Sequence, residues 1–300
     1  MATSVCIKLN GPFNLALSLD AAASFLPPTG AIPQSLRLAV RVGHRPTIIE
    51  IRQQSGRPAI IEASASVPLP RSRLKELALW LTSGDLDLRR FYRMASTHPV
   101  MGRVANRLQG LKPFRPASLF EMAIIAITEQ QLSIAAAFYI RTKLVRRFGM
   151  PIEDLWLFPT VDVVSKAALR DLRECGLSHR KAEYVRDFAR CVAKGDLALE
   201  ALKYQVDTKV RDSLIKCRGF GAWSAQYFLL RGLGRFDSLP AYDIGLRRTV
   251  GPYLSRRRRL TPEQLQRALS PFAPFRGLAA FYLAVDFRLK QHKPLPLDRR

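Results

Sequence analysis

The apolar residues of this 300-residue chain change their spacing near Leu74. Before that point, SLRLAVRV (35–42) and TIIEI (47–51) alternate apolar with polar residues or are rich in β-branched ones, which favours β-strands. GHRP and QSGRP are typical of hairpin turns, so residues 1 to about 70 are expected to be mainly strands. From Leu74 onward, apolar residues recur at i, i+3 and i+4, the period of an α-helix.

This change of period predicts an α+β protein with a small β-rich N-terminal domain, residues 1–79, followed by an all-α body. The join is SASVPLPRSR, a stretch of small polar residues and prolines that is typical of a linker. Within the body, TPEQLQRALSPF begins with Thr261, has proline at the next position and Gln264 three residues on. That pattern predicts a capped helix N-terminus.

The charge of the chain indicates its partner. Forty-eight Lys and Arg against 24 Asp and Glu give a net charge of +24, which attracts polyanions. We expect nucleic acid rather than a membrane surface, because there is no basic amphipathic helix with an aromatic belt and apolar runs such as AIIAI are too short to span a bilayer. The four cysteines lie far apart without a C-x-x-C pair, and the histidines are scattered. We therefore expect a reducing, intracellular location and no metal or cofactor.

The segment CRGFGAWSA (217–225) contains two glycines one residue apart, directly before an apolar helical stretch. Glycines allow a tight turn and a close approach of the backbone to a partner. The N–H groups and positive dipole end of the following helix form a seat for phosphate. DNA contacts are therefore expected at Gly219, Gly221, Ala222 and Ser224. Alone, a Gly-x-Gly pattern is more often a simple connection between two helices.

The wider context of this segment is more specific. Apolar–x–x–x–Gly–apolar–Gly–x–x–Ser–Ala, then a helix, then Pro–x–x–Asp–apolar–x–apolar–Arg resembles the helix-hairpin-helix DNA glycosylase superfamily, and most closely its 3-methyladenine DNA glycosylase II type. The resemblance extends over about residues 80–290. It implies two helical lobes around an active-site cleft. The middle lobe would span 115–235, and the other would combine 80–114 with 236–300.

The resemblance also implies roles for individual residues. Asp243 would stabilise the positive charge that develops on the sugar when an N-glycosidic bond breaks. Trp223 and Tyr227, four residues apart on one helix face, would line the pocket for the extruded base. Gln131 would be the wedge that fills the gap left in the duplex. From the residues alone, an N-cap is the favoured interpretation of Asp243 and core packing that of the aromatic pair. For Gln130 and Gln131, an exposed loop before a capped helix is the alternative.

The implied function is hydrolysis of alkylated purines from damaged double-stranded DNA by a monomer without a cofactor. Family members that also cut the strand have a lysine two residues after the second glycine, where this chain has Trp223, so water is the expected nucleophile. Two alternatives remain: a glycosylase for oxidised or deaminated bases, and a non-catalytic DNA-binding protein.

Three features depart from the family pattern or fall outside it. Ala284 replaces a stacking tryptophan of the last helix, so either Phe281 or Tyr282 compensates or the pocket is more open. Ile244 replaces a residue that is aromatic in some members. The run Arg256–Arg259 is a possible DNA contact, although such runs are usually solvated loops.

Overall fold

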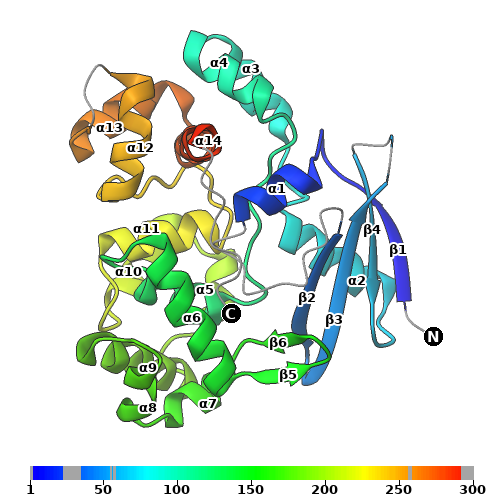
Figure 1. The fold of residues 1–300 in the computed structure, drawn as a ribbon, viewed down its shortest axis with the longest axis vertical. Coiled ribbons are helices and arrows are strands. Elements are labelled where there is room, and N and C mark those ends of the chain that lie inside the picture. Colours follow the sequence, from blue (N-terminus) through cyan, green and yellow to red (C-terminus); the bar gives the residue numbers. More distant parts are fainter. Residues whose placement is uncertain (1–2, 23–34, 55, 57–58, 256–258, 292–300) are drawn as a thin grey trace.

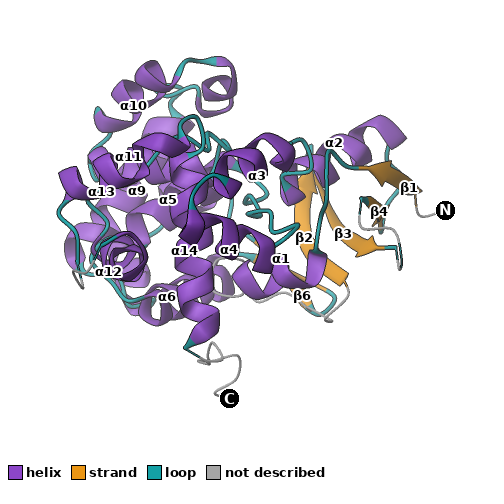
Figure 2. Ribbon diagram, turned by 90° about the horizontal axis from the view of Figure 1, so that it is seen from above, coloured by secondary structure: helices purple, strands orange, loops and turns teal. Residues whose placement is uncertain are grey.

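The structure, a computed structural model, describes residues 3–22, 35–54, 56, 59–255 and 259–291 (Figure 1). The α+β prediction is confirmed, because a small antiparallel sheet precedes a helical body. In both views the sheet lies at one end of the molecule, with the helices beside it (Figures 1 and 2).

The sheet has the strand order β1-β4-β3-β2, and neighbouring strands are antiparallel. SLRLAVRV forms β2 and TIIEI lies within β3, as predicted, and Gly43 and His44 form the turn between them. The predicted turn QSGRP includes residues 55, 57 and 58, which lie outside the described residues. The elements of this region are β1 (Thr3–Lys8), α1 (Leu15–Ala22), β2 (Ser35–Val42), β3 (Arg45–Gln53), β4 (Ile60–Ala65) and α2 (Arg71–Thr82).

The prediction that residues 1–70 are mainly strands is wrong for α1. Its sequence, LALSLDAA, is rich in Leu and Ala, which are strong helix formers. At its start the side-chain Oδ1 of Asn14 accepts the N–H of Leu17 at 3.0 Å. Leu15 and Leu19 then pack into the core, so local propensity and burial both favour a helix here.

The buried apolar side chains form two clusters. The first joins the sheet to a set of central helices, and so crosses the expected boundary between the N-terminal domain and the middle lobe. The elements of this part of the chain are α5 (Leu119–Thr128), α6 (Ile134–Phe148), β5 (Met150–Ile152), β6 (Leu155–Leu157), α7 (Val161–Lys166), α8 (Leu169–Glu174), α9 (His179–Ala193), η1 (Leu199–Tyr204), α10 (Asp207–Ile215) and α11 (Ala222–Arg231).

The second cluster brings together helices from two distant parts of the sequence. They are α3 (Leu88–Ser96), α4 (Pro99–Arg107), α12 (Ile244–Leu254), α13 (Pro262–Leu269), η2 (Ser270–Phe272) and α14 (Arg276–Lys290). The capping signature before α13 is confirmed, since Thr261 and the side chain of Gln264 bond each other's backbone N–H.

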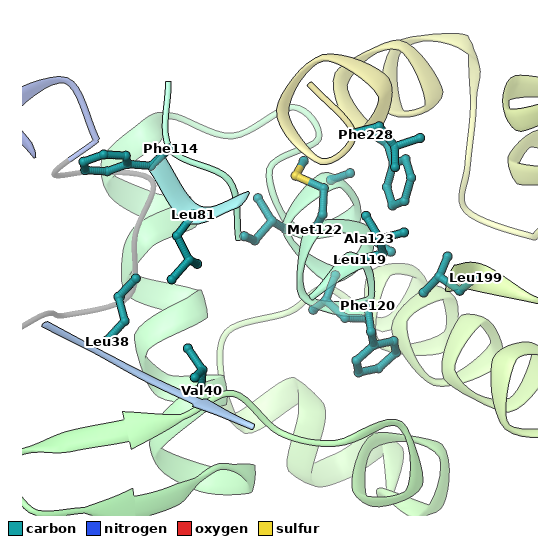
Figure 3. Packing of buried hydrophobic residues seen from close by; sticks show 14 of the residues in the cluster. Leu38, Val40, Leu81, Phe114, Leu119, Phe120, Met122, Ala123, Leu199 and Phe228 are labelled. Atoms are coloured by element: carbon teal, nitrogen blue, oxygen red, sulfur yellow. The ribbon is translucent and has the colours of Figure 1, made fainter. Parts of the chain in front are cut away.

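Helix α5 is the centre of the first cluster, and each of its residues is buried. Figure 3 shows Phe228 of α11 and Leu199 on one side of α5, where Phe120 also points. Leu38 and Val40 of β2 lie on its other side. A helix that is apolar all round can only lie in the interior. The loop that follows α5 is therefore held at a fixed place, beside the start of α11.

Among the described residues, no single helix is both long and apolar enough to cross a bilayer. The segments Pro262–Phe272 and Arg276–Lys290 reach that length and composition only when they are taken together across a bend of 106°.

Candidate active site and DNA interface

The two glycines of the hairpin between α10 and α11 have different structural roles. Gly219 has φ +97°, and a Cβ added there would come within 2.6 Å of the Tyr184 side chain. Its backbone conformation therefore requires glycine. Gly221, the N-cap of α11, has an ordinary extended backbone, and a Cβ there would meet no atom within 4 Å. Gly221 thus keeps an open surface in front of the helix.

The N-terminus of α11 presents its backbone N–H groups to this open surface. Gly221 has no side chain to cap them, and Gly221 and Ala222 are both exposed. Ser224 is 1% exposed, and its hydroxyl accepts a hydrogen bond from Gln130. Any contact of Ser224 with DNA therefore uses its backbone N–H and not its hydroxyl.

The hairpin is fixed to helix α9 by Arg218. Its guanidinium donates to Glu183 at 2.8 Å and to Asp187 at 3.0 Å, and it lies 5.4 Å from the ring centre of Tyr184. These carboxylates raise the pKa of Arg218 further above its usual value. The arginine next to the glycine turn thus orients the hairpin, and it is occupied by acidic residues of its own chain.

The loop between α5 and α6 is fastened to the same hairpin. The side-chain amide of Gln130 donates to the carbonyl of Gly219 and to the hydroxyl of Ser224, both at 2.7 Å. On the other side, Lys181 of α9 donates to the carbonyls of Thr128 and Gln130. Burial lowers the pKa of Lys181. The loop and the hairpin therefore form one connected unit.

Gln131 lies at the tip of this loop. Its side chain is exposed, and its φ of +53° is unusual for a residue with a Cβ. This conformation turns the chain sharply before Ser133 caps α6. The two glutamines, which look equivalent in the sequence, thus have different surroundings. Gln130 faces the hairpin, and Gln131 faces solvent.

Asp243 is held by two N–H donors. Its Oδ1 accepts from the backbone N of Leu246 at 2.7 Å, so it is the N-cap of α12. Its Oδ2 accepts from the indole Nε1 of Trp223 at 2.9 Å. In the described part of the chain, no Lys or Arg forms an ion pair with this partly exposed carboxylate. The cap explains its orientation, and the second oxygen faces the aromatic pair.

Trp223 and Tyr227 stack on each other along α11. Their ring centres are 5.2 Å apart and their planes differ by 19°. Burial, together with the nearby carboxylate of Glu129, raises the pKa of Tyr227 well above its usual value. Tyr227 therefore stays protonated. The structure joins Asp243 and both aromatic residues in one site, and Glu129, which sequence reasoning missed, lies near it and pairs with the buried Arg141.

The last helix, α14, gives a mixed outcome. Tyr282 is fully buried, and its hydroxyl donates to the carbonyl of Leu111 at 2.7 Å. Of the alternatives for Ala284, Tyr282 is therefore excluded, because its ring belongs to the second hydrophobic cluster. Phe281 is partly buried and lies 5.0 Å from the guanidinium of Arg231 on α11.

The other residues that the sequence analysis singled out are exposed or lie outside the described residues. Ile244 is 50% exposed at the start of α12. Lys216 is exposed at the end of α10, before the turn. Of the run Arg256–Arg259, residues 256–258 lie outside the described residues.

The hairpin, the loop and Asp243 all lie within a recognised family segment. A family model described as "HhH-GPD superfamily base excision DNA repair protein" matches residues 124–274, half of the chain. The chain belongs to this superfamily. A DNA-3-methyladenine glycosylase of Bacillus subtilis is 26% identical over 252 residues, which cover 81% of this chain and 83% of that protein.

Solved structures are similar over almost the whole chain. A 3-methyladenine DNA glycosylase from Archaeoglobus fulgidus has a TM-score of 0.84 and 25% identity, with 96% of this chain and 100% of that chain covered. The Clostridium acetobutylicum 8-oxoguanine glycosylase/lyase in complex with double-stranded DNA has a TM-score of 0.77, with 97% and 98% covered. At 17% identity, the second likeness shows the fold alone.

Substitution of the two hairpin glycines is expected to have different effects, one on folding stability and the other on DNA binding. Gly219→Ala should lower the melting temperature, because the left-handed backbone is strained by about 1–2 kcal/mol and Tyr184 must move. Gly221→Ala should fold normally but weaken DNA binding, because the added methyl group occupies the expected phosphate-binding position at the N-terminus of α11. Thermal melts and fluorescence anisotropy at several salt concentrations measure both effects. If Gly221→Ala binds DNA as tightly as the wild type, the hairpin does not grip phosphate.

The two adjacent glutamines provide a matched pair. Gln130→Ala leaves the buried Ser224 hydroxyl and the Gly219 carbonyl without this donor, which should cost about 1–3 kcal/mol of unfolding free energy in a urea titration. Gln131→Ala removes an exposed side chain and should stay within about 0.5 kcal/mol of the wild type. Equal stability of the two variants would contradict the role assigned to Gln130.

Proposed function

We propose that this protein is a monofunctional DNA glycosylase that hydrolyses the N-glycosidic bond of alkylated purines in duplex DNA. One observation carries the proposal. The carboxylate of Asp243 is fixed by the N–H groups of Leu246 and Trp223, directly beside a stacked aromatic pair. An oriented anion next to electron-rich rings suits a reaction in which a cationic base leaves and the sugar becomes positively charged.

Asp243 would act on the sugar. When the bond between C1′ and the purine nitrogen breaks, both electrons go to the base, and positive charge spreads over C1′ and the ring oxygen. The fixed carboxylate stabilises that charge and orients a water molecule, whose oxygen then bonds to C1′ and whose proton is lost. Because two N–H donors already hold the carboxylate, little reorganisation is needed during the reaction.

The aromatic pair would act on the base. A purine methylated at N3 or N7 carries a positive charge and leaves as a neutral base, so a general acid is not required. The faces of Trp223 and Tyr227 can attract that cation at about 0.5–2 kcal/mol. The names of the similar proteins from Bacillus subtilis and Archaeoglobus fulgidus support 3-methyladenine-type damage as the substrate class.

The hairpin and the loop would hold the DNA. Phosphate would bind at the exposed N-terminus of α11, at the backbone of Gly221, Ala222 and Ser224. Gln131, exposed at its loop tip, would fill the gap left by the flipped nucleotide. The net charge of +24 supports a polyanionic partner.

The first test removes the charge of Asp243 and keeps its shape. Asp243→Asn retains an oxygen that can cap α12, so the protein should fold, whereas release of the base should fall by at least ~10²-fold. Single-turnover assays on a duplex with one 7-methylguanine measure this rate. Asp237→Asn is the control, because that carboxylate is paired with Arg276 at the start of α14. Wild-type rates in the Asp243→Asn variant would remove this residue from the mechanism.

The second test concerns the nucleophile. An amine that attacks C1′ forms an imine, which borohydride reduces to a stable adduct between protein and DNA. Trp223 occupies the position from which a lysine would attack, and an indole cannot form an imine. Borohydride added during turnover should therefore trap no adduct, with a known bifunctional glycosylase as the positive control. Efficient trapping would replace the hydrolytic assignment with a lyase.

A further inference from the structure

A cavity of about 460 Å³ lies where helices α4, α12 and α14 meet. Figures 1 and 2 both show α14 between α4 and α12. The cavity is at the end of α12 that contains Tyr253, whereas Asp243 caps the other end, about 15 Å away at 1.5 Å per residue. Small-molecule sites have volumes of about 300–1,000 Å³. The cavity is therefore separate from the candidate active site and large enough for a small ligand.

The charged residues of this cavity favour an anion. Of the described residues that line it, none is acidic and three are cationic, namely Arg103, Arg107 and Lys290. Arg103 and Arg107 are four residues apart on α4, so they lie on the same helix face. All three residues are exposed. Their N–H groups can therefore reach a ligand in the cavity.

A buried carboxylate holds two of these cations in place. Asp286 accepts from Nε and Nη2 of Arg107, both at 2.9 Å, from Nζ of Lys290 at 3.0 Å, and from the hydroxyl of Tyr253. Its side chain is 4% exposed. Burial alone would raise the pKa of Asp286, but the hydrogen bonds from Tyr253, Lys290 and Arg107 keep that pKa below its usual value. The carboxylate therefore stays charged, and Nη1 of Arg107 is left for a ligand.

The net charge of this cluster matches a phosphate monoester. Three cations against the one carboxylate of Asp286 leave two positive charges. A phosphate monoester has a charge of about −1.5 to −2 at pH 7, and arginine binds its oxygens through paired N–H groups. A phosphodiester, with one negative charge, would leave one of the cations unbalanced.

Most of the remaining lining is apolar and includes two aromatic rings. These residues are Val100, Val104, Pro252, Tyr253 and Phe287. The ammonium of Lys290 lies 5.0 Å from the ring centre of Tyr253, so this ring already has a cation next to it. Phe287 is partly exposed and remains for a planar group. Nucleic-acid bases stack on such aromatic side chains.

We propose that this cavity binds a nucleoside monophosphate. The phosphate lies among Arg103, Arg107 and Lys290, and the base packs against Phe287. A free nucleotide and the phosphorylated end of a DNA strand contain the same chemical group. Neither Asp243 nor the aromatic pair of α11 takes part, so binding does not depend on the proposed reaction.

Isothermal titration calorimetry with 2′-deoxyadenosine 5′-monophosphate (dAMP) tests the proposal. For a ligand of this size the wild type should give a dissociation constant on the order of 10–100 µM. Deoxyadenosine and inorganic phosphate each contain only half of the recognised chemistry. Each should bind at least about 10-fold more weakly than dAMP.

Three variants assign the binding to the cavity. Arg103→Ala removes an exposed side chain and should weaken dAMP binding by about 10-fold, because charged hydrogen bonds are lost. Arg93→Ala is the matched control, since this exposed arginine of α3 lies outside the cavity lining. Phe287→Leu keeps an apolar side chain but removes the ring. It should weaken binding of dAMP and leave that of inorganic phosphate unchanged.

Asp243→Asn separates the cavity from the active site. Nucleotide bound in the cavity keeps its wild-type affinity in this variant, whereas a changed affinity would place it beside Asp243 and overturn the assignment. Equal weakening by Arg103→Ala and Arg93→Ala would show attraction by the overall positive charge and would also overturn it. No binding of dAMP to the wild type would reject the proposal.

Competition against dAMP identifies the source of the nucleotide. The competitors are a single-stranded trinucleotide with a 5′-phosphate and the same trinucleotide without it. Displacement by the phosphorylated form alone assigns the cavity to strand ends, and displacement by neither assigns it to free nucleotides. Equal displacement by both would contradict recognition of a phosphate monoester.

Discussion

The burial of helix α5 is the constraint on which the candidate site depends. Each of its residues is enclosed by the sheet on one side and by α9 and α11 on the other, so the end of the helix cannot shift without opening the core. The three residues directly after α5 are positioned by this fixed helix end. Glu129 pairs with Arg141 of α6, Gln130 bonds the hairpin, and Gln131 is exposed to solvent. A small shift of α5 would therefore move all three of these side chains.

Asp243 illustrates how one residue serves fold and chemistry together. As an N-cap it satisfies a backbone donor of α12, and the same bond fixes the carboxylate in space. The indole of Trp223 fixes the second oxygen. A helix cap is often regarded as an alternative to a functional role. Here the cap supplies the preorganisation that an electrostatic role requires.

Much of the fold was predictable from the sequence, because it depends on local patterns. Strand alternation in β2 and β3, the helical period after Leu74 and the capping box at Thr261 each involve residues close in the chain. Helix α1 was missed, since hairpin turns nearby favoured strands. Within the site, the stacking of Trp223 on Tyr227 follows from their spacing of four on one helix.

The interactions that connect the site were not predictable, because they join distant segments. Gln130 contacts Gly219, 89 residues away, and no spacing rule indicates such a partner. Glu129 was overlooked because its partner, Arg141, lies 12 residues further on, in the next helix. The sequence left Phe281 and Tyr282 both open, because α14 is apolar on several faces and periodicity does not identify which face turns toward α11.

The central claim is that Asp243 and the aromatic pair support hydrolytic release of a cationic purine. The most direct measurement incubates the wild-type protein with a duplex containing one 7-methylguanine, then analyses the free base by mass spectrometry and the strand by gel before and after hot alkali. The account predicts free 7-methylguanine and an intact strand that breaks only after alkali. No released base, or a strand cut during the incubation, would contradict it.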